Sequence, residues 1–278
     1  MTRKLSLGVV QCALSDDIAA NIEKIEGMIR KAAEKGARIV LTPELIQGRY
    51  FCATQDEAHF ARAYPTAEHP AVIALQKLAQ EWDVVLPVSI FERDHSCYYN
   101  SVVIIDAGGA ILGTYRKSHI PDGPGYQEKF YFRPGDTGFK AWDTKYGKIG
   151  VGICWDQWFP ECARSMMLQG AEILLYPTAI GSEPHNAALD TASRWQLAQR
   201  GHAVCNVVPV AAANRIGVEG GQTFYGSSFI CDQTGNLVAQ LDRTTEGVLV
   251  HEFDLDKIRA ERAAWGFFRD RRIDFYQP

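Results

Sequence analysis

Segments with the spacing of strands alternate along this chain with segments that have the spacing of helices, and this alternation constrains the fold more than any other feature. The apolar run 5–12 predicts a strand, and 18–35 predicts a helix because isoleucines recur there at helical spacing. Further strands are predicted at 38–42, 84–91, 98–105, 111–115, 148–154, 173–177 and 207–213. Further helices are predicted at 70–82, 160–169 and 187–203. Strands and helices in alternation predict an α/β fold.

The last third of the chain has a different pattern, in which strands follow one another closely. They are predicted at 227–231, 237–241 and 248–253. Hairpin-linked strands beside β–α units predict mixed sheets rather than purely parallel ones. No linker interrupts the chain, so we predict one domain over residues 1–278, with two packed sheets covered by helices. The segment 255–278 adds a helix and an aromatic tail, which we predict to contact another subunit because apolar surface usually marks an interface.

The composition excludes several classes of protein. Of the 278 residues, 46% are hydrophobic and 22% are charged, which is the balance of a globular protein rather than of a disordered or fibrous one. The formal net charge is −4, and no cluster of Lys and Arg offers a basic surface to nucleic acid. No apolar run approaches the roughly 20 residues that cross a bilayer. We therefore expect neither nucleic acid nor a membrane as a partner.

The N-terminus and the cysteines bear on the compartment. Thr2-Arg3-Lys4 before the apolar residues 5–14 is compatible with a short signal peptide, but Gln11 interrupts the run and no small-residue cleavage site follows, which favours a buried strand. The seven cysteines are odd in number and never spaced as C-x-x-C, which argues against a disulfide framework and against a zinc site. The seven histidines lack the spacing of a metal-binding motif. We expect a reducing compartment, the cytoplasm, and no metal or cofactor.

Three predicted strands lead into residues with reactive side chains. Glu44 and Lys117 each follow a predicted strand, and Cys154 ends another. Ligands of open α/β sheets bind beyond the C-terminal ends of the strands, so these groups would supply a base, a cation and a nucleophile there. Taken singly, each has a plainer interpretation. Glu44 suits a helix start or a salt bridge, Lys117 a solvated strand end, and Cys154 a small buried hydrophobic position.

Together, the motifs around these three residues resemble those of a known family. They are Pro43-Glu44, Tyr115-Arg116-Lys117, Gly152-Ile153-Cys154-Trp155-Asp156 and Phe159-Pro160-Glu161. They are similar to the motifs of the carbon–nitrogen hydrolase (nitrilase) superfamily, and the resemblance runs from Leu5 to about Asp254. It implies a four-layer α-β-β-α sandwich with two mixed sheets, a catalytic Glu–Lys–Cys triad, no cofactor, and homo-oligomers built from dimers.

The resemblance also matches Glu128 to a second glutamate that the family places beside its lysine. The alternative is a loop carboxylate that pairs with Lys129 or Arg133. Both interpretations stay open from the sequence.

The chemistry of these groups predicts a thiol amidohydrolase. A cysteine attacks carbonyl carbons as a thiolate, and we expect the cation of Lys117 to lower the pKa of Cys154 below its usual value of about 8.5. Lys117 and the backbone N–H of Trp155 would stabilise the oxyanion of the intermediate. Glu44 would take the thiol proton, pass it to the departing ammonia and then activate water.

The loops near the predicted site indicate a ureido or amide substrate with a positive far end. No arginine follows the nucleophile in 155–158, where relatives that bind a substrate carboxylate often have one. Asp122 and Glu183 would suit a distal ammonium; the alternatives are a turn residue and a surface charge. The resemblance to the superfamily also extends to the segments that contain Tyr50 and Trp155. We expect the side chains of these two residues to bind the substrate.

Two other functions remain open. One is another amidase of the same chemistry, acting on β-ureido acids, ω-amides or nitriles, in which Arg49 would face a carboxylate. The other is a non-catalytic protein that uses this fold as a scaffold. The complete triad argues against the scaffold, because a scaffold does not need all three groups.

Overall fold

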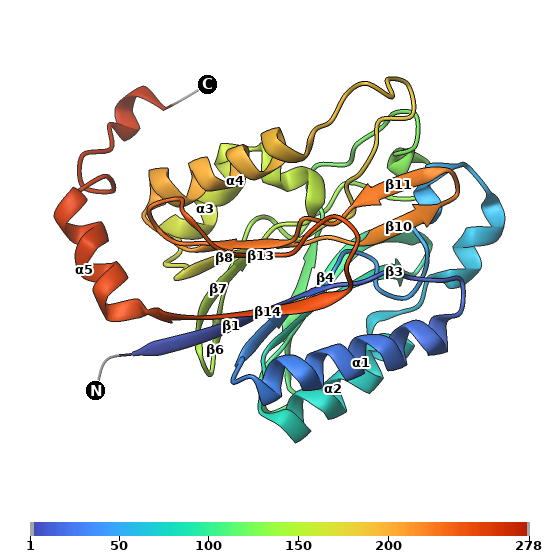
Figure 1. The fold of residues 1–278 in the computed structure, drawn as a ribbon, viewed down its shortest axis with the longest axis horizontal. Coiled ribbons are helices and arrows are strands. Elements are labelled where there is room, and N and C mark those ends of the chain that lie inside the picture. The colour runs from blue at the N-terminus through green and yellow to red at the C-terminus, as the bar shows by residue number, and fades with distance from the viewer. Residues whose placement is uncertain (1–2, 277–278) are drawn as a thin grey trace.

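Two mixed β-sheets pack face to face in the computed structural model, which describes residues 3–276 (Figure 1). In the first sheet, β1 (Lys4–Gln11) lies antiparallel to β14 (Gly247–Asp254) and parallel to β2 (Ile39–Leu41). Val85 donates its N–H to the carbonyl of Arg38 and accepts a hydrogen bond from the N–H of Val40, and these bonds continue this sheet into three antiparallel strands. These strands are β3 (Leu86–Asp94), β4 (Cys97–Ile105) and β5 (Ile111–Arg116).

The second sheet has six strands in the order β13-β12-β9-β8-β7-β6. The strands β7, β8 and β9 are parallel, and the outer ones are antiparallel to their neighbours. Their bounds are β6 (Ala141–Thr144), β7 (Gly147–Val151), β8 (Ile173–Pro177), β9 (Val210–Ala213), β12 (Phe229–Cys231) and β13 (Leu237–Gln240). A separate hairpin of β10 (Ile216–Glu219) and β11 (Gln222–Tyr225) leaves this sheet after β9.

Helices cover the outer face of each sheet, as Figure 1 shows. The helices on the first sheet are α1 (Ile18–Glu34) and α2 (Pro70–Trp82), and those on the second are α3 (Pro160–Leu168) and α4 (Ala192–Asn206). The architecture is therefore a four-layer α-β-β-α sandwich, as predicted. Short 3-10 turns lie at Phe51–Ala53, Glu57–Arg62, Thr66–Glu68, Glu128–Phe130, Cys154–Trp158 and Ile273–Phe275.

The alternation of side chains along each strand separates the core between the sheets from the cores under the helices. On β1, Leu7 and Val9 belong to the core between the sheets, whereas Val10 packs with α1. On β8, Leu175 faces the first sheet, whereas Leu174 packs under the helices of the second. A one-residue slip would exchange these faces, so the buried pattern fixes the register and with it the direction in which the strand ends point.

Most predicted elements are confirmed, and the differences have local causes. The helix α4 begins at Ala192, not at 187, and the Asp190 side chain accepts a hydrogen bond from the N–H of Ala192 at this start. The strand β9 begins at Val210, not at 207, because Val207 has φ +48° as the C-cap of α4. The strands β6, β10 and β11 were not predicted. The strand β14 does not follow β13 in its sheet but pairs with β1.

The last helix, α5 (Leu255–Trp265), and the tail after it extend along one end of the molecule (Figure 1). This segment carries several large apolar side chains that are more than a third exposed. They are Trp265, Phe267, Ile273, Phe275 and Tyr276. None of the helices within residues 3–276 is long and apolar enough to cross a membrane.

Candidate active site

Glu44, Lys117 and Cys154 meet beyond the C-terminal ends of β2, β5 and β7. Glu44 and Lys117 follow strands of the first sheet and Cys154 follows a strand of the second, so the site lies at the strand ends between the two sheets. All three side chains are buried, with exposed fractions of 0%, 1% and 5%. The pairing of the sheets thus brings together three groups that are remote in the sequence.

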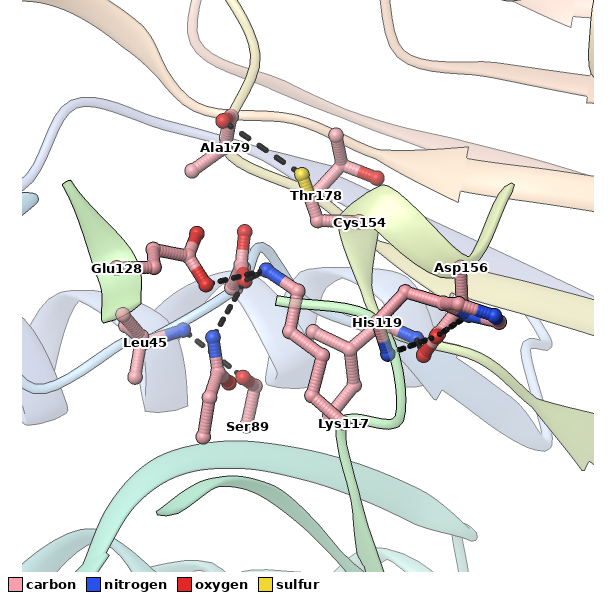
Figure 2. A network of polar contacts seen from close by, with 12 residues as sticks. Leu45, Ser89, Lys117, His119, Glu128, Cys154, Asp156, Thr178 and Ala179 are labelled. Carbon is pink, nitrogen blue, oxygen red and sulfur yellow. Dashed lines mark hydrogen bonds and ion pairs between the residues drawn. The ribbon is translucent and has the colours of Figure 1, made fainter. Parts of the chain in front are cut away.

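The ammonium of Lys117 lies between two carboxylates. Its Nζ donates to Oε1 of Glu44 at 2.8 Å. It also donates to Oε2 of Glu128 at 2.7 Å (Figure 2). The other oxygen of Glu128 accepts a hydrogen bond from the Tyr50 hydroxyl at 2.7 Å. Glu128 is therefore not the loop carboxylate of the alternative interpretation. It is fully buried and bonds to the lysine.

Burial and charge act in opposite directions on this cluster. Burial alone would lower the pKa of Lys117, but the carboxylates of Glu128 and Glu44 raise it well above its usual value, so the lysine is a cation. Burial raises the pKa of Glu128 to about 7, while Lys117 opposes this rise. Lys117 is thus a buried cation flanked by two carboxylates.

Glu44 has one carboxylate oxygen bound and one free. Its Oε1 accepts hydrogen bonds from Lys117 and from Nδ2 of Asn100, the latter at 2.6 Å. Its Oε2 is buried and makes no hydrogen bond with any described residue of the protein. Since both oxygens of Glu128 are occupied, Glu44 is the carboxylate of the pair with an oxygen available to accept a proton.

Cys154 is the first residue of a 3-10 turn and has φ +40°, which is rare for a residue with a side chain. The strand β7 ends at Val151, so the prediction that this strand runs to Cys154 is wrong by three residues. A Cβ at position 152 would lie only 2.9 Å from side-chain atoms of both Cys162 and Tyr176, which is too close. Glycine at this position therefore allows the chain to pass these side chains as it enters the turn. The turn directs Sγ toward the carbonyl oxygen of Ala179, 3.7 Å away (Figure 2).

The buried carboxylate of Asp156 holds this turn to the strand end that carries the lysine. Its Oδ2 accepts hydrogen bonds from the N–H of Ile153 at 2.9 Å and from the Tyr115 hydroxyl at 2.7 Å. Its Oδ1 accepts from the N–H of His119 at 3.0 Å and meets the Nδ1 of the same ring at 2.8 Å (Figure 2). Asp156 therefore fixes the position of Cys154 relative to residues 115–119.

The pKa of Cys154 corrects one prediction. The expectation was that Lys117 lowers it. Instead, the pKa is raised well above its usual value, first by burial and then by the charge of Glu44, and Lys117 only partly opposes these effects. The resting thiol is protonated, so its reaction requires a base.

A cavity of about 410 Å³ opens onto the thiol. Of the predicted residues, Asp122, Trp155 and Glu183 line it together with Glu128 and Cys154. Tyr50 does not line it; its ring packs against Tyr126 and Phe224, and its hydroxyl is bound to Glu128. Burial raises the pKa of Glu183, and the nearby His185 opposes this.

Several residues of the site have no recognisable signal in the sequence. Tyr126, Trp158 and Arg194 line the cavity, and Asn100 binds Glu44 from β4. For Asn100, the sequence offers one weak signal of a role in the site, which is its position as a polar residue within a mostly apolar strand. No cluster of three or more His, Cys, Asp or Glu side chains with the geometry of a metal site occurs within residues 3–276.

Comparison with known proteins identifies the family. A model described as carbon–nitrogen hydrolase matches residues 6–263. The chain belongs to the carbon–nitrogen hydrolase family. This hydrolase is 56% identical over 283 residues to N-carbamoylputrescine amidase of Arabidopsis thaliana, covering 99% of this chain and 95% of that protein.

A second relative and a solved structure are similar to this hydrolase over nearly its whole length. It is 52% identical over 276 residues to a citrullinase of Francisella tularensis, covering 98% of this chain and 96% of that protein. Among solved structures, it matches a carbon–nitrogen hydrolase from Helicobacter pylori G27 with a TM-score of 0.93 and 40% identity, covering 98% and 97% of the two chains. The protein is a hydrolase that acts on amide C–N bonds.

Proposed function

We propose that this enzyme hydrolyses N-carbamoylputrescine to putrescine, ammonia and CO2. The observation that carries the proposal is that one cavity contains both the thiol of Cys154 and the carboxylate of Glu183. N-carbamoylputrescine has a ureido carbon for the thiol at one end and an ammonium for the carboxylate at the other. The identity to the amidase of Arabidopsis thaliana supports the same substrate.

In the first half-reaction, Sγ of Cys154 forms a bond to the ureido carbon while Oε2 of Glu44 takes the thiol proton. A base is required because the pKa of Cys154 is raised. The carbonyl electron pair moves onto oxygen, where Lys117 and the N–H of Trp155 stabilise the charge. Glu44 then returns the proton to the terminal nitrogen, the C–N bond breaks and ammonia leaves. The product is an S-linked thiocarbamate that still carries the putrescine arm.

In the second half-reaction, Glu44 takes a proton from water as the water oxygen attacks the thiocarbamate carbon. The C–S bond breaks and Cys154 recovers its proton. The carbamic acid of putrescine is released and loses CO2. Glu128 serves as a positioning residue in this scheme, because its two oxygens bind Lys117 and Tyr50.

Glu183 accounts for the preference for a cation. It is partly buried, so an ionised carboxylate there is poorly hydrated and gains from an ammonium partner. A charge-assisted hydrogen bond contributes roughly 1.5–3 kcal/mol, or about 10- to 150-fold in kcat/KM. Asp122 is exposed, so its contribution is about fivefold or less.

Ammonia release from N-carbamoylputrescine and from N-carbamoyl-β-alanine tests the proposal. We expect the cationic substrate to be preferred, Cys154→Ala to be inactive, and Glu183→Gln to raise KM for the cationic substrate more than it lowers kcat. Glu81→Gln, on the exposed side of α2 outside the cavity, is the matched control. Equal or better turnover of N-carbamoyl-β-alanine would replace the proposal with a β-ureido acid hydrolase.

Arg194 favours a second candidate, the hydrolysis of citrulline. It lines the same cavity as Glu183, and no ion pair within residues 3–276 includes it. Citrulline carries both an ammonium and a carboxylate at its far end, and the relative from Francisella tularensis is a citrullinase. Turnover of citrulline above that of N-carbamoylputrescine, lost in Arg194→Gln, would decide for this function.

We further propose that the chain acts as one domain in the cytoplasm and assembles into homo-oligomers built from dimers. The apolar side chains exposed on residues 255–276 support a subunit contact by this segment. Residues 277–278 lie outside the described part of the chain. Light scattering of the protein with and without residues 266–278 would test the contact, and an unchanged mass would contradict it.

A further inference from the structure

Arg215 is a fully buried arginine that does not line the cavity. It lies directly before β10, and its guanidinium donates four hydrogen bonds. Nη1 donates to the Glu219 carboxylate at 2.7 Å and to the carbonyl of Gly48 at 3.2 Å. Nη2 donates to the carbonyls of Glu44 at 2.5 Å and Leu45 at 3.2 Å. One side chain thus binds three backbone carbonyls of the segment that carries Glu44.

Glu219 binds the other end of the same segment. Its Oε2 accepts hydrogen bonds both from Arg215 and from the N–H of Tyr50 at 2.6 Å. The hydroxyl of Tyr50 in turn donates to Glu128. The ion pair therefore holds residues 44–50 at both ends, and each end leads to one of the two carboxylates that flank the lysine.

The segment 44–50 needs such support because it is neither helix nor strand. Leu45 has φ +49°, in the left-handed region that residues with side chains rarely adopt. The segment is almost entirely buried, so its carbonyls must find donors within the protein. Arg215 supplies donors to three of them from a single rigid group.

We propose that the Arg215–Glu219 ion pair is a positioning device for the catalytic base. It sets the backbone of Glu44 so that Oε1 stays bound to Lys117 and Oε2 stays free to take the thiol proton. This role rests on the proposed function, in which Glu44 moves the protons. Neither Arg215 nor Glu219 lines the cavity, so their effect is on the rate of the chemical step rather than on substrate binding.

Two variants test this role. Arg215→Lys keeps the charge, but a compact ammonium cannot reach all four oxygens. A displacement of the base by about 1 Å costs up to about 100-fold in rate, so we expect kcat to fall about 10- to 100-fold with KM unchanged within about threefold. Arg215→Met with Glu219→Gln removes the pair without leaving a buried charge, and we expect a larger loss of kcat than in Arg215→Lys.

Arg262→Lys is the matched control. Arg262 donates to the backbone carbonyls of Asn206 and Val207 at 2.9–3.2 Å, remote from the cavity. If Arg215 had only a structural role, both lysine variants would have a lower melting temperature, and both would keep the wild-type kcat per folded enzyme. That result, or a change in KM alone, would overturn the proposal. If Arg215→Lys does not fold, Glu219→Gln is the test variant instead. A wild-type kcat in Glu219→Gln would also overturn the proposal.

The rate of alkylation of Cys154 by iodoacetamide separates this proposal from the proposed function. It needs no substrate, and we expect it to be slower in Arg215→Lys at neutral pH, because the thiol then loses its base. If N-carbamoylputrescine is not hydrolysed but the variant is alkylated more slowly, the substrate is wrong and the positioning role stands. If Cys154→Ala is inactive and Arg215→Lys has wild-type kcat and alkylation rate, only the positioning role fails.

Discussion

The substitution Asp156→Asn tests whether one carboxylate holds the turn that presents the nucleophile. Oδ1 of Asp156 contacts the backbone N–H and the imidazole of His119, and Oδ2 contacts the backbone N–H of Ile153 and the hydroxyl of Tyr115. The imidazole and the hydroxyl can each donate or accept a hydrogen bond, whereas a backbone N–H can only donate. An amide has a single oxygen. Whichever way it turns, one backbone N–H faces an NH2 group and loses its acceptor, whereas the Tyr115 hydroxyl or the imidazole can adapt.

The expected effect follows from the burial of this site. Asp156 is 0% exposed, and a buried N–H without an acceptor costs about 1–3 kcal/mol. For a chain of this size each kcal/mol lowers the melting temperature by about 2–4 °C, so we expect a decrease of about 2–12 °C. The left-handed backbone of Cys154 persists only while its surroundings enforce it, so we also expect kcat to fall about 10- to 100-fold as Sγ moves.

Thermal unfolding followed by circular dichroism, together with ammonia release at saturating substrate, measures both effects. The control is Asp143→Asn, because the side chain of Asp143 is 84% exposed and, among residues 3–276, pairs with Lys148 alone. That surface pair contributes at most about 1 kcal/mol, so the control should change little. An Asp156→Asn enzyme with the melting temperature and kcat of the control would refute the assignment of Asp156 to the turn.

Three further predictions concern charge and protons at the site. Lys117→Ala should lower kcat about 100- to 1,000-fold and also lower the melting temperature, because Glu44 and Glu128 would stay buried without their cation; an effect on KM alone would contradict this. The KM for N-carbamoylputrescine should rise as the pH falls toward the raised pKa of Glu183, since the protonated carboxyl no longer attracts the ammonium. Glu183→Gln should flatten that dependence, and a flat wild-type profile would count against it. Full activity should survive dialysis against a chelator, whereas iodoacetamide should inactivate; loss to the chelator alone would overturn the mechanism.

The sequence was sufficient for the order of the elements and for the three reactive groups. Apolar periodicity is a local property, and it predicted α2 and β8 with the bounds that the structure has. Because ligands bind beyond strand ends, Glu44, Lys117 and Cys154 could be assigned to one site without knowledge of the strand order. The motifs then predicted the family and the four layers.

Only the tertiary structure decided the electrostatics and the support of the site. The pKa of Cys154 was predicted with the wrong sign, because its rise depends on burial and on the distance to Glu44, which no local pattern encodes. Arg215 lies 171 residues from Glu44 in the sequence, yet its guanidinium holds that residue's carbonyl. Hydrogen bonds of this kind form between segments that only the packed sheets bring together. The sequence alone therefore determines which groups react, and the fold determines their protonation and their position.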